Sequence, residues 1–246
     1  MYSSETSRKD AGRPSKGSVM PSAAATSATT ARRLVEAIVS HEDYPCLGAR
    51  AALRRGVMVS EAFGPLDNAD TTVALHRALL DFIDHWLRPD ENFATFVAVF
   101  SAPTNVSEKA FELALWRQLT RLSELDARTH SWAASVDGDP SSPDFAFSVG
   151  GEAFFVVGMH DRSSRSARRF PLPTLAFNHH AQFDRLKAAD VYGGLQERIR
   201  ARELRLQGSL NPNLAEHGEA SEARQYSGRA AEADWSCPFH VEDPPS

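Results

Sequence analysis

The fold is decided by one stretch of sequence, DFAFSVGGEAFFVVGM at residues 144–159. Its two halves are rich in aromatic and β-branched residues, which favour β-strands. Between them stand Gly150, Gly151 and Glu152, and adjacent glycines are typical of the tight turn of a β-hairpin. We therefore predict two antiparallel strands, over residues 144–149 and 153–159.

Working outward, the neighbouring segments add strands and helices to this hairpin. The run ATFVAVF at residues 94–100 predicts a buried strand that ends before Pro103. Apolar residues at helical spacing predict two long helices, over residues 69–87 and 107–125. Asn68 or Asp70 would cap the first helix, and Ser107 would cap the second.

The remaining segments complete the expected element order. A short strand is predicted over residues 174–177, and helices are predicted over 180–189 and 193–206. Because a hairpin is mixed with helices, we expect an α/β or α+β fold, a single domain with a mixed β-sheet flanked by helices. Ordered structure should begin near Ala31, after a disordered tail over residues 1–29 that lacks apolar periodicity. The domain is expected to span residues 30–240, followed by a C-terminal tail over 241–246.

Composition excludes several classes of protein. The chain has 246 residues, 42% of them hydrophobic, which is enough for a substantial core. The net charge is -5 and both signs are interspersed, so the sequence shows no basic patch of the kind that binds nucleic acid. No apolar run approaches the roughly 20 residues that a membrane span needs, and the first thirty residues lack the apolar core of a secretory signal. We expect a cytoplasmic protein with no nucleic-acid or membrane partner.

The two cysteines, Cys46 and Cys237, each adjoin a proline. Two are too few for a disulfide framework or for a zinc site built from cysteine alone. A thiolate on such a rigid turn is suited to ligate iron. The alternative is that each is a small buried apolar residue, which is the usual place of a free cysteine.

Histidines and arginines form a second group of candidates. His160 follows the predicted strand 153–159, where it would serve as an iron ligand, as an acid/base group, or as a turn residue bonded to the backbone. His179 and His180 resemble a metal pair, but adjacent side chains on a strand or helix point in different directions. Four arginines lie close together in the sequence, and they would anchor carboxylates through bidentate pairs or form a solvated basic loop: Arg162, Arg165, Arg168 and Arg169.

The segment 211–226 carries the opposite charge. Its glutamates, with neighbouring Asn, Gln and Tyr side chains, form a polar group able to hold a cation, and an exposed helix start is the competing interpretation.

Several short segments of the chain, taken in order, resemble those of the YqcI/YcgG family. The resemblance rests on residues 44–46 (YPC), 154–160 (FFVVGMH), 168–171 (RRFP), 176–178 (AFN), 182–183 (QF), 211–212 (NP), 217–219 (HGE), 222–226 (EARQY) and 235–239 (WSCPF). It runs from about residue 31 to 239. Within that family the chain resembles the haem-dependent guanidine N-hydroxylases of the type named in guanitoxin and cycloserine biosynthesis.

The resemblance implies a b-type haem that activates dioxygen. The substrate would be a free arginine-like amino acid, which is hydroxylated at a guanidinium nitrogen. The axial ligand would be Cys46 or Cys237, which are equally good candidates, and His160 is a weaker candidate for this role. His160 is instead the first candidate for the catalytic acid/base. Arg165, Arg168 and Arg169 would pair with the haem propionates. The substrate would be bound by Glu219, Glu222, Arg224 and Asn211, and an external electron donor, a redox partner, would be required.

Two other functions stay open from the sequence. The first is a non-catalytic haem-binding sensor or carrier. The second is a protein without haem in which His160, His179 or His180 holds a divalent ion together with a carboxylate.

Overall fold

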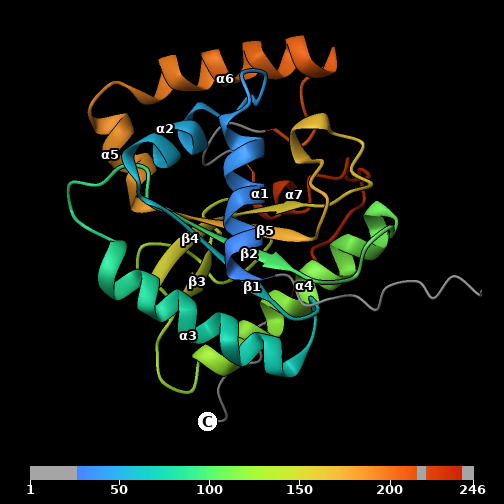
Figure 1. The fold of residues 1–246 in the computed structure, drawn as a ribbon. Coiled ribbons are helices and arrows are strands. Elements are labelled where there is room, and N and C mark those ends of the chain that lie inside the picture. The colour runs from blue at the N-terminus through green and yellow to red at the C-terminus, as the bar shows by residue number, and fades with distance from the viewer. Residues whose placement is uncertain (1–26, 215–219, 240–246) are drawn as a thin grey trace, which may run out of the picture.

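The computed structural model describes residues 27–214 and 220–239, which form one domain with a central β-sheet between layers of helices (Figure 1). The helices are α1 (Ala28–Ser40), α2 (Leu47–Arg55), α3 (Ala69–Trp86), α4 (Glu108–Asp126), α5 (Ala181–Ala188), α6 (Tyr192–Gln207) and α7 (Ala223–Tyr226). The strands are β1 (Met58–Phe63), β2 (Thr95–Phe100), β3 (Phe147–Val149), β4 (Glu152–Met159) and β5 (Thr174–His179). A 3₁₀ turn, η1 (Ser166–Arg168), follows β4.

The sheet is mixed, as the sequence predicted. Its strand order is β1-β2-β5-β4-β3, in which only β1 and β2 run parallel. The helix α3 makes the crossover between these two strands, because parallel neighbours need a long connection. No helix within the described ranges is long and apolar enough to cross a bilayer.

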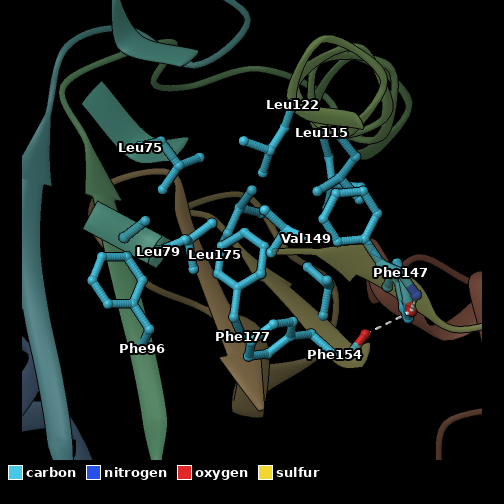
Figure 2. Close-up of a cluster of buried hydrophobic side chains, with 14 of the residues drawn as sticks. Leu75, Leu79, Phe96, Leu115, Leu122, Phe147, Val149, Phe154, Leu175 and Phe177 are labelled. Atoms are coloured by element: carbon cyan, nitrogen blue, oxygen red, sulfur yellow. Dashed lines mark hydrogen bonds between the residues drawn. The ribbon is translucent and has the colours of Figure 1, made fainter. Parts of the chain in front are cut away.

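One face of the sheet is covered by α3 and α4. Figure 2 shows leucines of the two helices, among them Leu75 and Leu115, directed at a layer of aromatic rings from the strands, such as Phe96, Phe154 and Phe177. These side chains are fully buried or nearly so. Their burial removes apolar surface from water and so stabilises the fold.

The opposite face is covered by α1 and α2, which pack on Val97, Val99 and Ala176. Further along this face α6 contacts α2 and α5, and Figure 1 shows it as the outermost helix of the layer. Alternate residues of a strand point to opposite faces, so Phe155 and Val157 of β4 face the α2/α5/α6 layer while Phe154 and Val156 join the aromatic layer.

The helix predictions are confirmed within a few residues, and so are two of the caps. The side chain of Asn68 accepts the N–H of Thr71, and that of Ser107 accepts the N–H of Ala110. The tail prediction is wrong at its end, because residues 28 and 29 are helical and Ser27 caps α1. The rest of that tail and residues 241–246 lie outside the described residues.

The hairpin is confirmed, with two corrections. Its first strand is shorter than predicted, because residues 144–146 are outside β3 and Phe145 makes only an isolated bridge to Asp137. Its turn is the two-residue loop Gly150-Gly151, since Glu152 already pairs with Val149. Both glycines have positive φ, 62° and 75°, which is the backbone that tight hairpin turns require.

Gly158 of β4 occupies a position with no room for a side chain. An added Cβ would lie 2.5 Å from Cδ1 of Leu115 and 2.8 Å from the carbonyl oxygen of Tyr226. Because the second neighbour is backbone, we expect Gly158→Ala to lower the free energy of unfolding by about 1–3 kcal/mol in urea denaturation. The control is Gly193→Ala in α6, where nothing lies within 4 Å and a gain of about 0.5–1 kcal/mol is expected. Equal stability of the two variants would contradict the prediction.

Candidate functional site

A cavity of about 290 Å³ lies between the sheet and helices α2, α5 and α6. This volume is just below the range for small-molecule pockets, roughly 300–1,000 Å³. Its walls are largely apolar and aromatic, and a smaller polar set converges on it. The apolar set includes Phe155, Val157, Phe183, Leu186, Leu195 and Ile199, and the polar set includes Cys46, Asn178, His180, Arg200, Glu203, Glu222 and Gln225.

Cys46 enters this cavity from the N-terminus of α2. Its Sγ accepts the backbone N–H of Ala49 at 3.4 Å, so the thiol serves as the N-cap of the helix. Burial raises the pKa of the Cys46 thiol, while the backbone N–H groups and the guanidinium of Arg168 oppose this rise. The free thiol is therefore the favoured form, and a cation beside the sulfur would favour the thiolate.

Glu222 lies at the N-cap position of α7 and reaches the cavity with a buried carboxylate. One oxygen lies 3.3 Å from Nε2 of His180, and the other accepts a hydrogen bond of 2.5 Å from the hydroxyl of Tyr226. Burial raises the pKa of Glu222, although both partners favour its charged form. Burial also raises the pKa of Tyr226 far above its usual value. The carboxylate is thus held rigidly in a largely apolar cavity.

Glu203 adds a second carboxylate to the cavity lining, from α6. It pairs with Arg165 at 2.5 Å, and that arginine also donates to the carbonyl oxygens of Ser209 and Leu210. The ion pair therefore holds the C-terminal end of α6 against the segment that precedes η1.

Cys237, the other ligand candidate, lies in a different hollow. This open depression of about 1,060 Å³ is lined by Trp132, Asp137 and other residues of the loop before β3. Burial raises the pKa of Cys237 to about 12. The structure thus separates the two cysteines, and only Cys46 shares a cavity with Glu222 and His180.

His160 lines neither the cavity nor the hollow. It extends β4 on the α4 face, where its ring stacks on Phe111 at a centroid distance of 4.3 Å. The side chain is 1% exposed and Nδ1 has no hydrogen-bond partner. Burial lowers the pKa of His160, so its neutral form is favoured.

The three arginines predicted to bind propionates instead bond to other groups of the protein. Arg168 donates to the carbonyl oxygens of Gly158, Gln225 and Tyr226, and Arg169 donates to that of Ser163. Burial lowers the pKa of Arg168. With Arg165 bound to Glu203, all three hold loops together, and none lines the cavity.

The other predicted residues are dispersed. Glu219 lies outside the described residues. Arg224 stacks on Trp235 and donates to the carbonyl oxygens of residues 232, 233 and 235, and Asn211 accepts the N–H of Asn213. Neither lines the cavity. His179 bonds to Glu152 at 2.8 Å, whereas His180 faces Glu222, so the adjacent histidines do take different partners.

Sequence reasoning missed the contribution of α6 to the cavity. Leu195, Gln196, Ile199, Arg200 and Glu203 all line it, and their spacing places them on one face of a helix. This spacing was the available signal, because residues three or four apart in sequence lie on the same face of a helix.

One of three comparisons with known proteins gives a match. The model of the YqcI/YcgG family matches residues 35–240. No curated protein and no solved structure matches the chain.

Proposed function

The chain belongs to the YqcI/YcgG family, and from this premise we propose that it is a haem-dependent oxygenase that hydroxylates a guanidinium nitrogen of a free arginine-like amino acid. The resemblance to the guanidine N-hydroxylases supplies the chemistry. The observation that carries the proposal is that Cys46 and the buried carboxylate of Glu222 line the same largely apolar cavity.

The donor set of the cavity fits a haem. Cys46 would hold the iron, since its sulfur lies in the cavity lining at a helix N-terminus, where backbone N–H groups favour the thiolate. Aromatic and aliphatic walls suit the macrocycle, and Arg200 is the lining arginine that would pair with a carboxylate. When bound, the haem would supply dioxygen activation, which a thiolate ligand promotes more strongly than imidazole.

The same cavity offers the groups that would bind and orient the substrate. A guanidinium forms short, charge-assisted hydrogen bonds with a carboxylate, and Glu222 presents one that Tyr226 and His180 hold in place. The apolar side chains of Phe155, Phe183 and Leu186 would exclude water around this pair, which strengthens it. Orientation of the terminal nitrogen is then the main contribution of the protein.

We expect Glu222→Gln to weaken the binding of arginine-like substrates by roughly ten- to a hundredfold, because a hydrogen bond to a charged group contributes about 1.5–3 kcal/mol. Haem content should not change. The matched control is Glu152→Gln, which alters another glutamate–histidine pair, that with His179, outside the cavity. Calorimetric titration measures both variants, and parallel loss of haem would show that Glu222 serves the fold instead.

The pH dependence of binding follows from the same carboxylate. Since burial raises the pKa of Glu222, lowering the pH through that raised value protonates the group. Affinity for a guanidinium should therefore fall as the pH decreases and return as it increases, and Glu222→Gln should remove this dependence.

The deciding experiment is an optical spectrum of the protein expressed with a haem precursor and then reduced under carbon monoxide. A strongly red-shifted ferrous-CO band is expected for a thiolate ligand, followed by turnover with an arginine analogue and an electron donor. Haem that passes rapidly to a scavenger, with no response to arginine analogues, would favour a haem carrier or sensor. The absence of any haem band would overturn the proposal.

A further inference from the structure

A second group of ligand-type side chains lies on the opposite face of the sheet from the cavity. We call it the His-Asp-His cluster: His76 of α3, Asp126 at the end of α4, and His130 just beyond it. Nε2 of His76 lies 2.7 Å from Oδ1 of Asp126, and Nδ1 of His130 lies 2.9 Å from the same oxygen. A histidine of α3, fifty residues away in sequence, and one four residues beyond Asp126 thus converge on one carboxylate oxygen.

The carboxylate of Asp126 is fixed in orientation. Its other oxygen, Oδ2, accepts the backbone N–H of Gly150 at 2.9 Å, from the hairpin turn. The Asp126 side chain is 7% exposed and that of His76 is 11% exposed, whereas His130 is 32% exposed. Backbone bonds that orient a ligating carboxylate in this way are typical of the outer shell of metal sites.

The charge of Asp126 also calls for a cation. A buried carboxylate is costly unless a positive charge compensates it. In the part of the chain that the structure describes, the ion pairs of Asp126 are with the two histidines, and no lysine or arginine pairs with it. The histidines supply that charge only when protonated, whereas a divalent ion supplies it while the rings stay neutral.

From these contacts we propose that the His-Asp-His cluster binds one divalent cation of the zinc type. Its three ligand atoms lie within 4.8 Å of one another, and two imidazoles with one carboxylate form a ligand set that zinc accepts. Each ring would present its lone pair at the nitrogen nearest Asp126 and carry its proton on the other nitrogen. No fourth histidine, cysteine or carboxylate joins the group within the described ranges, so water would complete the coordination beside the half-buried His130.

Such an ion would connect three elements of the fold, α3, α4 and the turn between β3 and β4. Because the unfolded chain does not bring the ligands together, a bound ion stabilises the folded state. The site is independent of the haem proposal, since it uses other residues on the other face of the sheet.

The test is a titration of the full chain, treated with a chelator, with Co²⁺ and then with Zn²⁺. One equivalent of Co²⁺ should give the visible spectrum of a four-coordinate ion, which Zn²⁺ should then displace, and zinc should raise the Tm. The variants His76→Gln and His130→Gln should each weaken binding by more than a hundredfold. The second variant removes the more exposed ring, so it tests the site even where the first fails to fold.

Two controls make the result specific. His85→Gln alters the exposed Asp81–His85 pair of α3, which has the same four-residue spacing as Asp126–His130, and it should bind Co²⁺ like the wild type. Cys46→Ala should do so too, which separates this site from a thiolate site in the cavity. A wild-type chain that binds no Co²⁺ at one equivalent, or a folded His130→Gln chain with unchanged affinity, would show that the cluster is a hydrogen-bonded triad only.

Discussion

Cys46→Ser is expected to abolish the red-shifted ferrous-CO band, whereas Cys237→Ser leaves it intact. The reason is position: Cys46 lines the cavity that contains Glu222, and Cys237 lines a separate open hollow. Serine is a suitable replacement because its hydroxyl also caps a helix, so α2 keeps its N-cap and loses only the thiolate. Optical spectra and haem content of the purified variants measure the effect.

The outcome also decides between the remaining ligands. If only Cys237→Ser loses the band, the haem site must be sought in the hollow beside Trp132. If both variants keep it, the thiolate hypothesis is wrong. The ligand to test is then a histidine, first His180, which lines the cavity, and then His160, which the sequence singled out.

The largest effect on stability is expected at the ion pair between Glu112 of α4 and Arg229. Two guanidinium nitrogens of Arg229 lie 2.7 and 2.9 Å from the same oxygen of Glu112, and the hydroxyl of Ser227 donates to the other oxygen. Both side chains are 9% exposed. Arg229→Met would leave a buried carboxylate without its cation, and we expect a loss of about 3–5 kcal/mol in the free energy of unfolding.

An exposed arginine–glutamate pair provides the control. Arg32 and Glu36 of α1 lie 2.7 Å apart, but their side chains are 73% and 41% exposed. Because water screens this pair, Arg32→Met should change stability by at most about 0.5 kcal/mol. The double variant Glu112→Gln/Arg229→Met should recover part of the loss, since it removes both buried charges. Similar stabilities for Arg229→Met and Arg32→Met would contradict the argument.

The elements predicted from the sequence are those with a strong local pattern. The helices α3 and α4, the strand β2 and the hairpin have apolar periodicity, caps or glycines that act over a few residues. The strand β1 was not predicted. Its residues MVSEAF mix polar and apolar side chains and are mostly half-buried, because β1 lies at the sheet edge and pairs only with β2.

The sequence predicted some of the residues of the candidate site, but it did not predict correctly which residues lie together. Cys46 and Glu222 were named from sequence, and the structure brings both to one cavity. The arginines were grouped by their density along the chain, but their guanidinium groups bond to carbonyl oxygens of distant segments, such as residues 209–210 and 225–226. Contacts of that range depend on tertiary packing, which spacing in the sequence does not encode.

The hydroxyl of Tyr226 has a consequence for the order in which the protein is made. It accepts the backbone N–H of Phe147 and donates to Glu222, and thereby fastens α7 to the hairpin. All five strands precede residue 180, whereas α7 follows residue 222. During synthesis the ribosome therefore releases the whole sheet, and Cys46 with it, well before the carboxylate that would contact substrate. A nascent chain arrested after α6 would carry Glu203, already paired with Arg165, but not Glu222, so under the proposed function it should not bind a guanidinium compound.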